Sequence, residues 1–243
     1  MTRAFRNALA FLSRLVPPPS PSAAPLSDGK NGLADAVPFY PLAGAILGLI
    51  AALPAMLVPA VAAWLYPLIL AWLTRGLHWD GLADLADACG SNATGDRFWE
   101  IIKDSRIGAF GVMALVFAIA GQMLAAHGCI GSGNLFALIL APAYGRAMVI
   151  VLGRLTRPHP ASTLAALIQP GTGSRSSLLA LAATLAAAFF ILRPLPFLAA
   201  LGLTAACLAV LVRIASRHSG ANGDFYGAVI IAAETAVLLA GGL

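Results

Sequence analysis

Three aspartates at helical spacing stand out in an otherwise apolar chain. Asp80, Asp84 and Asp87 occur in the run HWDGLADLAD, and in a helix their i+4 and i+7 spacing places the carboxylates on one face. Carboxylates crowded in this way repel one another unless a cation lies between them. A divalent metal that prefers oxygen ligands suits them, and Mg²⁺ in such sites usually bridges to substrate phosphates. The pattern therefore predicts phosphoryl or pyrophosphate chemistry.

A second polar cluster, EIIKDSRIGAFG, follows in the same stretch between two apolar runs. Lys103 and Arg106 flank Asp104, and Gly108 is one of two glycines at the start of the next apolar run. A phosphate ligand needs such cations beside a metal-binding carboxylate, because metal neutralises some of its oxygens and Lys or Arg takes the rest. The alternative is that Lys103 and Arg106 bind no phosphate and belong to a solvated run of charges near the membrane. It does not explain Asp104, since an acid gains nothing from the positive-inside bias.

The third cluster, NGDFYGA, leads into the last apolar run, which contains Glu234. Asp224 either joins the site or caps the helix that follows. A charge near the middle of a bilayer costs at least ~2.5 kcal/mol, so Glu234 is expected to be functional or paired. Arg146 lies in another apolar run, ~12 Å from its polar end at 1.5 Å per residue, which is a similar depth. We predict that Arg146 and Glu234 pair; the alternative is that Arg146 reaches a substrate phosphate.

Composition excludes a soluble domain. The 243 residues are 60% hydrophobic and 10% charged, with a mean hydropathy of +0.87, whereas soluble domains carry ~25% charged residues. We therefore expect a single all-α domain, a polytopic integral membrane helical bundle embedded in the lipid bilayer. The net charge of +5 is expected to orient the chain and to meet anionic lipid headgroups. It is not read as a sign of nucleic-acid binding.

Hydropathy predicts about seven transmembrane helices, each near the ~20 residues that a bilayer needs. They are expected at residues 38–57, 58–74, 109–127, 134–153, 177–192, 195–212 and 225–242. The fifth and sixth, on either side of Arg193, are short enough to form a re-entrant hairpin instead. Basic residues gather in every second loop, beginning with the N-terminal segment. The positive-inside rule then places the N-terminus in the cytoplasm and the C-terminus outside.

Three further segments complete the predicted organisation. Residues 1–16 place Phe5, Ala8, Leu9, Leu12 and Leu15 on one helical face, which favours an interfacial helix on the cytoplasmic leaflet. Residues 17–37 are predicted to be a Pro-rich linker. Residues 75–108 hold the first two polar clusters and are predicted to form a cytoplasmic catalytic segment, an acidic loop-helix.

These motifs resemble the cobalamin synthase family. The runs HWDGLADLAD, EIIKDSRIGAFG and NGDFYGA carry the resemblance, with FLSRL at 11–15 and FYPLAG at 39–44, and they occur in family order along the chain. The chain departs from the family pattern at Arg75 and Ala88, where the family tends to have glycine, and at Asn222, where it tends to have threonine. All the acidic positions match.

The resemblance implies an integral membrane transferase of the last stage of adenosylcobalamin assembly, in the bacterial cytoplasmic (inner) membrane with its active site facing the cytoplasm. Such enzymes join adenosylcobinamide-GDP to the 5′-hydroxyl side of α-ribazole, or to its 5′-phosphate, and release GMP, with Mg²⁺. The resemblance leaves open whether the chain forms a homo-oligomer or associates with other membrane proteins of corrin assembly.

The resemblance also implies roles for individual residues. Four carboxylates would hold Mg²⁺ against the pyrophosphate, and one of them would take the proton of the attacking 5′-hydroxyl: Asp80, Asp84, Asp87 and Asp104. Charge on the leaving GMP would be taken by Lys103 and Arg106. His78 is either a second candidate base or a residue at the helix start. Further candidates for substrate contact are Asp224 and Arg146, and expected supports of the site are Gly81, Gly108 and Glu234.

Two other classes of membrane protein compete with this interpretation. A CDP-alcohol phosphotransferase requires an Ala-Arg pair after its Asp-Gly, whereas Ala83 is followed here by Asp84, and a prenyltransferase requires a second Asp-rich repeat. A cation-coupled transporter would place ionisable residues mid-span on several helices, whereas here most lie in one segment. The pattern favours the transferase.

Overall fold

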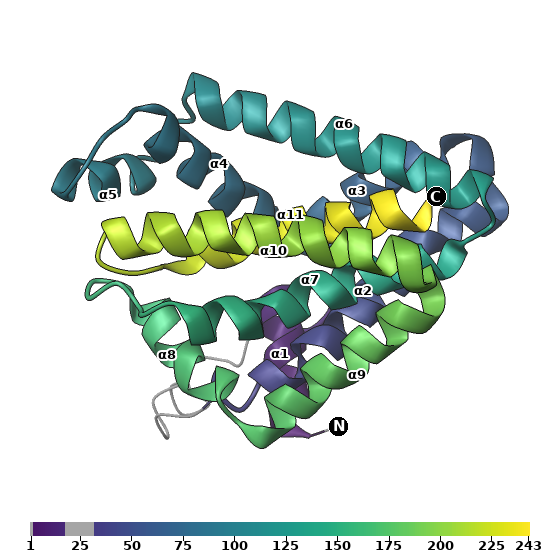
Figure 1. The fold of residues 1–243 in the computed structure, drawn as a ribbon, viewed down its shortest axis with the longest axis horizontal. Coiled ribbons are helices and arrows are strands. Elements are labelled where there is room, and N and C mark those ends of the chain that lie inside the picture. The colour runs from purple at the N-terminus through teal and green to yellow at the C-terminus, as the bar shows by residue number, and fades with distance from the viewer. Residues whose placement is uncertain (1, 18–31) are drawn as a thin grey trace.

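The computed structural model describes residues 2–17 and 32–243, and this part of the chain folds as a bundle of helices (Figure 1). Its elements, in chain order, are α1 (Arg3–Leu12), η1 (Val37–Phe39), α2 (Tyr40–Leu57), α3 (Pro59–Leu73), α4 (Leu77–Gly90), α5 (Asp96–Ile102), α6 (Ala109–Gly131), α7 (Leu135–Leu155), α8 (Thr163–Thr172), α9 (Arg175–Leu192), α10 (Pro194–Arg217) and α11 (Gly223–Gly241).

The length and composition of the helices confirm the prediction of a polytopic membrane bundle. Among the described residues, six segments are long and apolar enough to cross a bilayer: η1 with α2, then α6, α7, α9, α10 and α11. The two helices around Arg193 are both in this set, with 18 and 24 residues. Each is long enough to cross by itself, so nothing in their length requires a re-entrant hairpin.

The predicted second span, 58–74, differs from the structure. α3 has only 15 residues, ~22 Å at 1.5 Å per residue, which is less than the ~30 Å hydrocarbon core. Arg75 and Gly76 follow with φ of 58° and 73°, and the chain bends by 91° into α4. The two helices together would form a seventh, broken span. Arg75 departs from the family pattern at this left-handed position, which glycine adopts without strain.

The acidic helix α4, with which the predicted cytoplasmic segment 75–108 begins, lies within the bundle. α4 packs between α6 and α11 (Figure 1). Glycines permit the close approach to α11: a Cβ on Gly81 would lie 2.7 Å from Asp224 Cα, and one on Gly227 would lie 2.9 Å from the His78 carbonyl oxygen. The alternation of small apolar and acidic residues lets α4 bury one face while its carboxylates stay accessible.

Helix α1 is amphipathic as predicted, and its apolar face is used by the protein itself. Ala8, Leu9 and Leu12 are buried, and α1 packs on η1 and α2. The Arg14 amide donates to the Leu73 carbonyl (2.8 Å), which ties the end of α1 to the end of α3. That its outer face lies on lipid stays a prediction. Residues 18–31 of the predicted Pro-rich linker lie outside the described residues.

Candidate active site

The first two aspartates of α4 face an open cleft. Asp80 and Asp84 are one helical turn apart and line a cleft of about 390 Å³ together with Arg75 and Ser105. The negative charges of Asp80, Asp87 and Asp224 all act on Asp84, so four carboxylates from α4 and α11 gather here. Among the described residues, Asp80 and Asp84 belong to none of the three ion pairs, and Arg75, the cation that shares the cleft, donates instead to the Ala10 and Phe11 carbonyls.

Asp87 has a different environment from its two neighbours on α4. Its Oδ2 accepts a hydrogen bond from the Gly108 amide (2.7 Å) and its Oδ1 accepts one from the Gly111 amide (2.8 Å). Gly108 is the N-cap of α6, so Asp87 satisfies amides that the start of that helix would otherwise leave unpaired. A Cβ at either glycine would collide with the Asp87 carboxylate. The predicted supporting role of Gly108 thus has a steric explanation.

Asp104 is committed to Arg106 on the connection between α5 and α6. Arg106 donates from Nε to Oδ1 (3.0 Å) and from Nη2 to Oδ2 (2.7 Å), and its amide also donates to Oδ1 (3.0 Å). These hydrogen bonds, with the positive charge of Arg106, lower the pKa of Asp104 to about 2. Ser105 and Ile107, rather than Lys103 and Arg106, line the acidic cleft.

Two of the four predicted metal ligands fit a magnesium ion as they stand. Within residues 2–17 and 32–243, no three His, Cys, Asp or Glu side chains are placed to hold one metal ion. Mg²⁺, however, is commonly held by one or two carboxylates, with substrate phosphates and water completing its shell. Asp80 and Asp84 meet that requirement, since both line the cleft. The oxygens of Asp87 and Asp104 already have hydrogen-bond partners.

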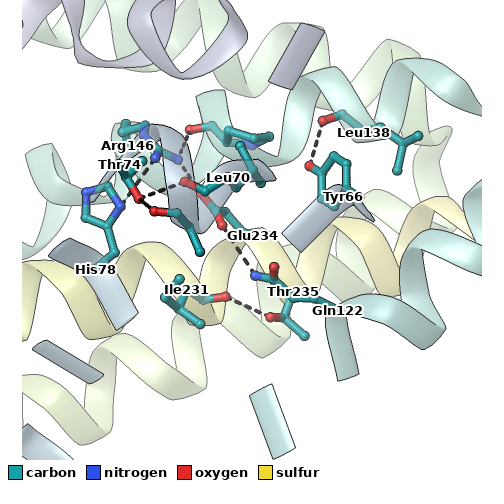
Figure 2. Close-up of polar contacts among 12 residues, drawn as sticks. Tyr66, Leu70, Thr74, His78, Gln122, Leu138, Arg146, Ile231, Glu234 and Thr235 are labelled. Atoms are coloured by element: carbon teal, nitrogen blue, oxygen red, sulfur yellow. Dashed lines mark hydrogen bonds and ion pairs between the residues drawn. The ribbon is translucent and has the colours of Figure 1, made fainter. Parts of the chain in front are cut away.

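The predicted pair inside the bundle is confirmed. Arg146 of α7 forms an ion pair with Glu234 of α11, and their side chains are only 1% and 3% exposed (Figure 2). Arg146 Nη1 also donates to the Pro142 carbonyl (3.1 Å), and Gln122 of α6 donates to Glu234 Oε2 (3.3 Å). These partners offset much of the cost of burying two charges. Arg146 therefore faces Glu234 and does not line the cleft.

His78 joins this network from the first turn of α4. Arg146 Nη2 lies 3.3 Å from His78 Nδ1. Because an arginine only donates, Nδ1 must accept, and the proton of the neutral ring is then on Nε2. His78 is thus a buried hydrogen-bond donor at Nε2, which does not suit a general base. Sequence spacing did not reveal this contact, because it depends on the bend before α4.

The start of α11 places Asp224 beside α4. The N-cap is Asn222, whose Oδ1 accepts from the Asp224 amide (3.2 Å) and whose Nδ2 donates to Asp224 Oδ2 (2.6 Å). The alternative that Asp224 is the cap is therefore wrong. Asp224 lies instead in the first turn, against Gly81, where its charge adds to the acidic cluster.

Sequence reasoning missed the contacts that hold α5. The Phe98 ring stacks on His218 with centroids 3.7 Å apart, and the Trp99 ring stacks on His159 with centroids 3.9 Å apart. Trp99 Nε1 also donates to the His218 carbonyl (3.1 Å). The two histidines lie in the loops after α7 and α10, so no local periodicity could have paired them with α5.

A comparison with protein families identifies the chain. A family model described as cobalamin-5-phosphate synthase matches residues 4–242. The chain belongs to this family. As a member, it is an enzyme of cobalamin synthesis, and the match spans nearly the whole chain.

Individual relatives carry one name, adenosylcobinamide-GDP ribazoletransferase. A protein with this name from Nitratidesulfovibrio vulgaris is 44% identical over 98% of this chain and 94% of its own length. Others, from Syntrophobacter fumaroxidans and Sinorhizobium medicae, are 36% and 38% identical over 97% and 96% of this chain, and over 96% and 93% of their own lengths. No solved structure matches the chain.

Proposed function

We propose that the protein transfers the adenosylcobinamide-phosphate moiety from adenosylcobinamide-GDP to α-ribazole or α-ribazole 5′-phosphate and releases GMP. The names of relatives that align over nearly the whole chain support this donor and this acceptor. The observation that carries the proposal is the pair of carboxylates, Asp80 and Asp84, that line an open cleft and form no ion pair with a protein cation among the described residues. Such a pair is suited to a pyrophosphate held through a divalent cation.

The bond changes follow from the two substrates. An acceptor hydroxyl attacks the phosphorus that carries the cobinamide, the bond from that phosphorus to the GMP oxygen breaks, and the hydroxyl proton passes to a carboxylate and then to solvent. The 5′ oxygen of α-ribazole 5′-phosphate is already esterified, and the family description names a 5-phosphate product. We therefore assign the attack to a ribose ring hydroxyl, which corrects the expectation of a 5′-hydroxyl.

The residues in and near the cleft then have separate roles. Mg²⁺, held by Asp80 and Asp84, would neutralise the pyrophosphate and stabilise charge on the leaving oxygen. Asp224 adds negative charge beside them and suits a further contact with the ion or its waters. Arg106 and Lys103 remain the candidates for binding the departing GMP, and Arg106 would have to leave Asp104 to do so.

We further propose that the protein lies in the cytoplasmic membrane with this cleft toward the cytoplasm. The end of the bundle that holds α5 also holds the loops after α7 and α10. Arg154, Arg157 and Arg217 lie in or next to those loops, whereas Arg193 lies at the opposite end (Figure 1). This asymmetry supports a cytoplasmic α5 end.

Replacement of Asp84 by Asn tests the proposed chemistry. Asp84→Asn keeps the side-chain size and removes a ligand charge, so GMP release should fall by at least ~100-fold while expression and membrane insertion stay near normal. Asp96→Asn, at an exposed position outside the cleft, is the matched control and should keep wild-type activity. The measurement is GMP released by purified protein from adenosylcobinamide-GDP with α-ribazole and, separately, with α-ribazole 5′-phosphate, across a Mg²⁺ titration. Wild-type activity of Asp84→Asn at limiting Mg²⁺ would exclude the metal site, and absence of GMP release by the wild type would exclude the function.

A further inference from the structure

A second pocket adjoins the acidic cleft. It has a volume of about 90 Å³ and shares Leu77 and Asp80 with the cleft. Its walls are mainly apolar and aromatic, with side chains from α1, α2, α4, α7, α8 and α11. Phe11 and Tyr40 stack at one side with ring centroids 6.1 Å apart. The pocket is thus shaped mainly by rings and aliphatic groups, and two carboxylates, Asp80 and Asp224, lie among them.

Two buried polar groups line this pocket without a hydrogen-bond partner among the described residues: His78 Nε2 and the Tyr40 hydroxyl. His78 is 4% exposed and Tyr40 is 1% exposed. Arg146 holds His78 at Nδ1, and Nε2 lies on the outer side of the ring, beyond the network (Figure 2). A buried donor that lacks a partner costs stability, so such groups in native proteins call for an explanation. A ligand in the pocket would supply the missing partners.

We infer that this pocket binds the base of the acceptor nucleoside, an uncharged benzimidazole. The inference rests on the proposed function, from which α-ribazole comes as the acceptor. The base of α-ribazole is a flat, largely apolar bicycle, and its one free ring nitrogen accepts a hydrogen bond. One of the two unpaired groups pairs with that nitrogen and the other with a ribose oxygen. Apolar walls with few polar groups at fixed places are typical of small-molecule sites.

The chemistry of the walls separates this base from the other groups of the two substrates. Guanine carries several donors and acceptors around its edge, and only those that face Asp80, Asp224, His78 or Tyr40 would gain partners here. The bicyclic base is itself larger than 90 Å³, so it would extend from the pocket toward the adjoining cleft, and a corrin ring is several times larger again. An acyl chain of a lipid would fit the apolar walls but would leave His78 and Tyr40 unpaired. The benzimidazole satisfies both requirements.

The position of the pocket also determines how the two substrates lie relative to each other. Asp80 lines both the pocket and the cleft. A nucleoside whose base enters the pocket presents its ribose at Asp80, next to the carboxylates proposed to hold the pyrophosphate. Asp80 is then the carboxylate that faces the attacking hydroxyl.

A single-atom substitution tests the pocket. Tyr40→Phe removes only the unpaired hydroxyl, and Tyr144→Phe is a matched control because it removes another buried hydroxyl without a partner that does not line the pocket. Binding of α-ribazole to detergent-solubilised protein would be measured by equilibrium dialysis, and the KM of each substrate by GMP release. We expect Tyr40→Phe to weaken α-ribazole binding about three- to tenfold, the usual effect of one hydrogen bond. The KM for adenosylcobinamide-GDP should not change, and Tyr144→Phe should alter neither value.

A second variant fills the pocket instead of removing a polar group. Ile168→Phe adds a ring to the wall contributed by α8. It should weaken binding of α-ribazole more than binding of a smaller analogue, the benzimidazole riboside that lacks the methyl groups of the α-ribazole base. If Tyr40→Phe and Ile168→Phe bind α-ribazole as the wild type does, the pocket inference is wrong, whatever the activity. A raised KM for adenosylcobinamide-GDP alone would also overturn it. If the wild type binds α-ribazole, Tyr40→Phe weakens binding and no GMP is released, the pocket stands and the proposed function fails.

Discussion

Asp84 and Asp87 are close on one helix, yet their surroundings give them different roles. Asp84 lines the cleft and interacts with other negative charges. Asp87 uses both of its oxygens to accept backbone amides at the start of α6, where the helix dipole also favours a negative charge. The spacing in the sequence predicted the shared face of α4 correctly. It could not distinguish the two roles, because the amides come from a helix that begins about twenty residues later.

This difference predicts opposite effects on stability and activity. Asp87→Ala should destabilise the protein by about 1.5–3 kcal/mol, since it leaves two amides of α6 without a charged acceptor. Asp84→Ala should change stability by no more than ~0.5 kcal/mol while abolishing GMP release. Denaturant titration in detergent, followed by circular dichroism, measures the stability of each variant. Equal destabilisation by the two variants would mean that Asp84 is also structural.

At the scale of elements, hydropathy predicted most of the helices, and the charges predicted how two of them pair. Long apolar runs gave the spans that hold Arg146 and Glu234, and the matching depths of these residues gave their contact. Hydropathy ended a span at residue 74, beside the break at Arg75 and Gly76, but it did not predict the bend that brings α4 against α6 and α11, because a left-handed backbone leaves no hydropathy signal. The approach of His78 and the docking of α5 depend on that break and on distant loops, so local sequence carried no signal for them.

The network that joins α4, α6, α7 and α11 predicts strong coupling between its two charges. Arg146→Met strands Glu234 and should cost ~3–5 kcal/mol, whereas the double variant with Glu234→Gln should recover part of that loss. Arg154→Met, at an exposed position on the same helix, is the control and should have little effect. Thermal unfolding of the singles and the double gives the coupling. Additive losses would mean that the two residues are not energetically linked.

The docking of α5 predicts a dependence on pH. Burial, reinforced by the positive charge of Lys103, lowers the pKa of His159, and Asp96 opposes the shift; burial with Arg217 lowers the pKa of His218. The unfolded histidines therefore take up protons at higher pH than the docked ones. Docking is fully favoured above about pH 6.5 and weakens as the pH falls below that value.

Fluorescence of Trp99 follows this equilibrium in a variant whose other three tryptophans are replaced by phenylalanine. Its emission should shift to the red as the pH falls below about 6.5, because the indole leaves its stack and meets water. His159→Phe keeps an aromatic partner that does not titrate, so the shift should shrink. An unchanged shift in His159→Phe would assign the pH dependence to another group.

For the whole molecule, the arrangement of helix ends decides which surfaces share a side of the membrane. The hydroxyl of Ser132, after α6, donates to the Gly241 carbonyl at the end of α11 (3.3 Å). The end of α6 and the C-terminal end of the chain are therefore together, opposite the α5 end (Figure 1). The charge bias then predicts the α5 end inside and the C-terminal end outside.

Single cysteines test the orientation and the broken span together. In a background without Cys89, Cys129 and Cys207, new cysteines at Ala60, Ser91 and Ser132 mark the start of α3, the end of α4 and the end of α6; all three positions are exposed. If α3 and α4 together cross the bilayer, an impermeant maleimide should label Ala60→Cys and Ser132→Cys from outside intact cells, and Ser91→Cys only after permeabilisation. Labelling of Ala60→Cys and Ser91→Cys from one side would instead make α3 and α4 a re-entrant pair. The chain would then cross the membrane six times, and the sides of the two ends of the bundle would have to be assigned again. The acidic cleft would stay at the α5 end, because α6 is the only spanning helix between Ser91 and Ser132.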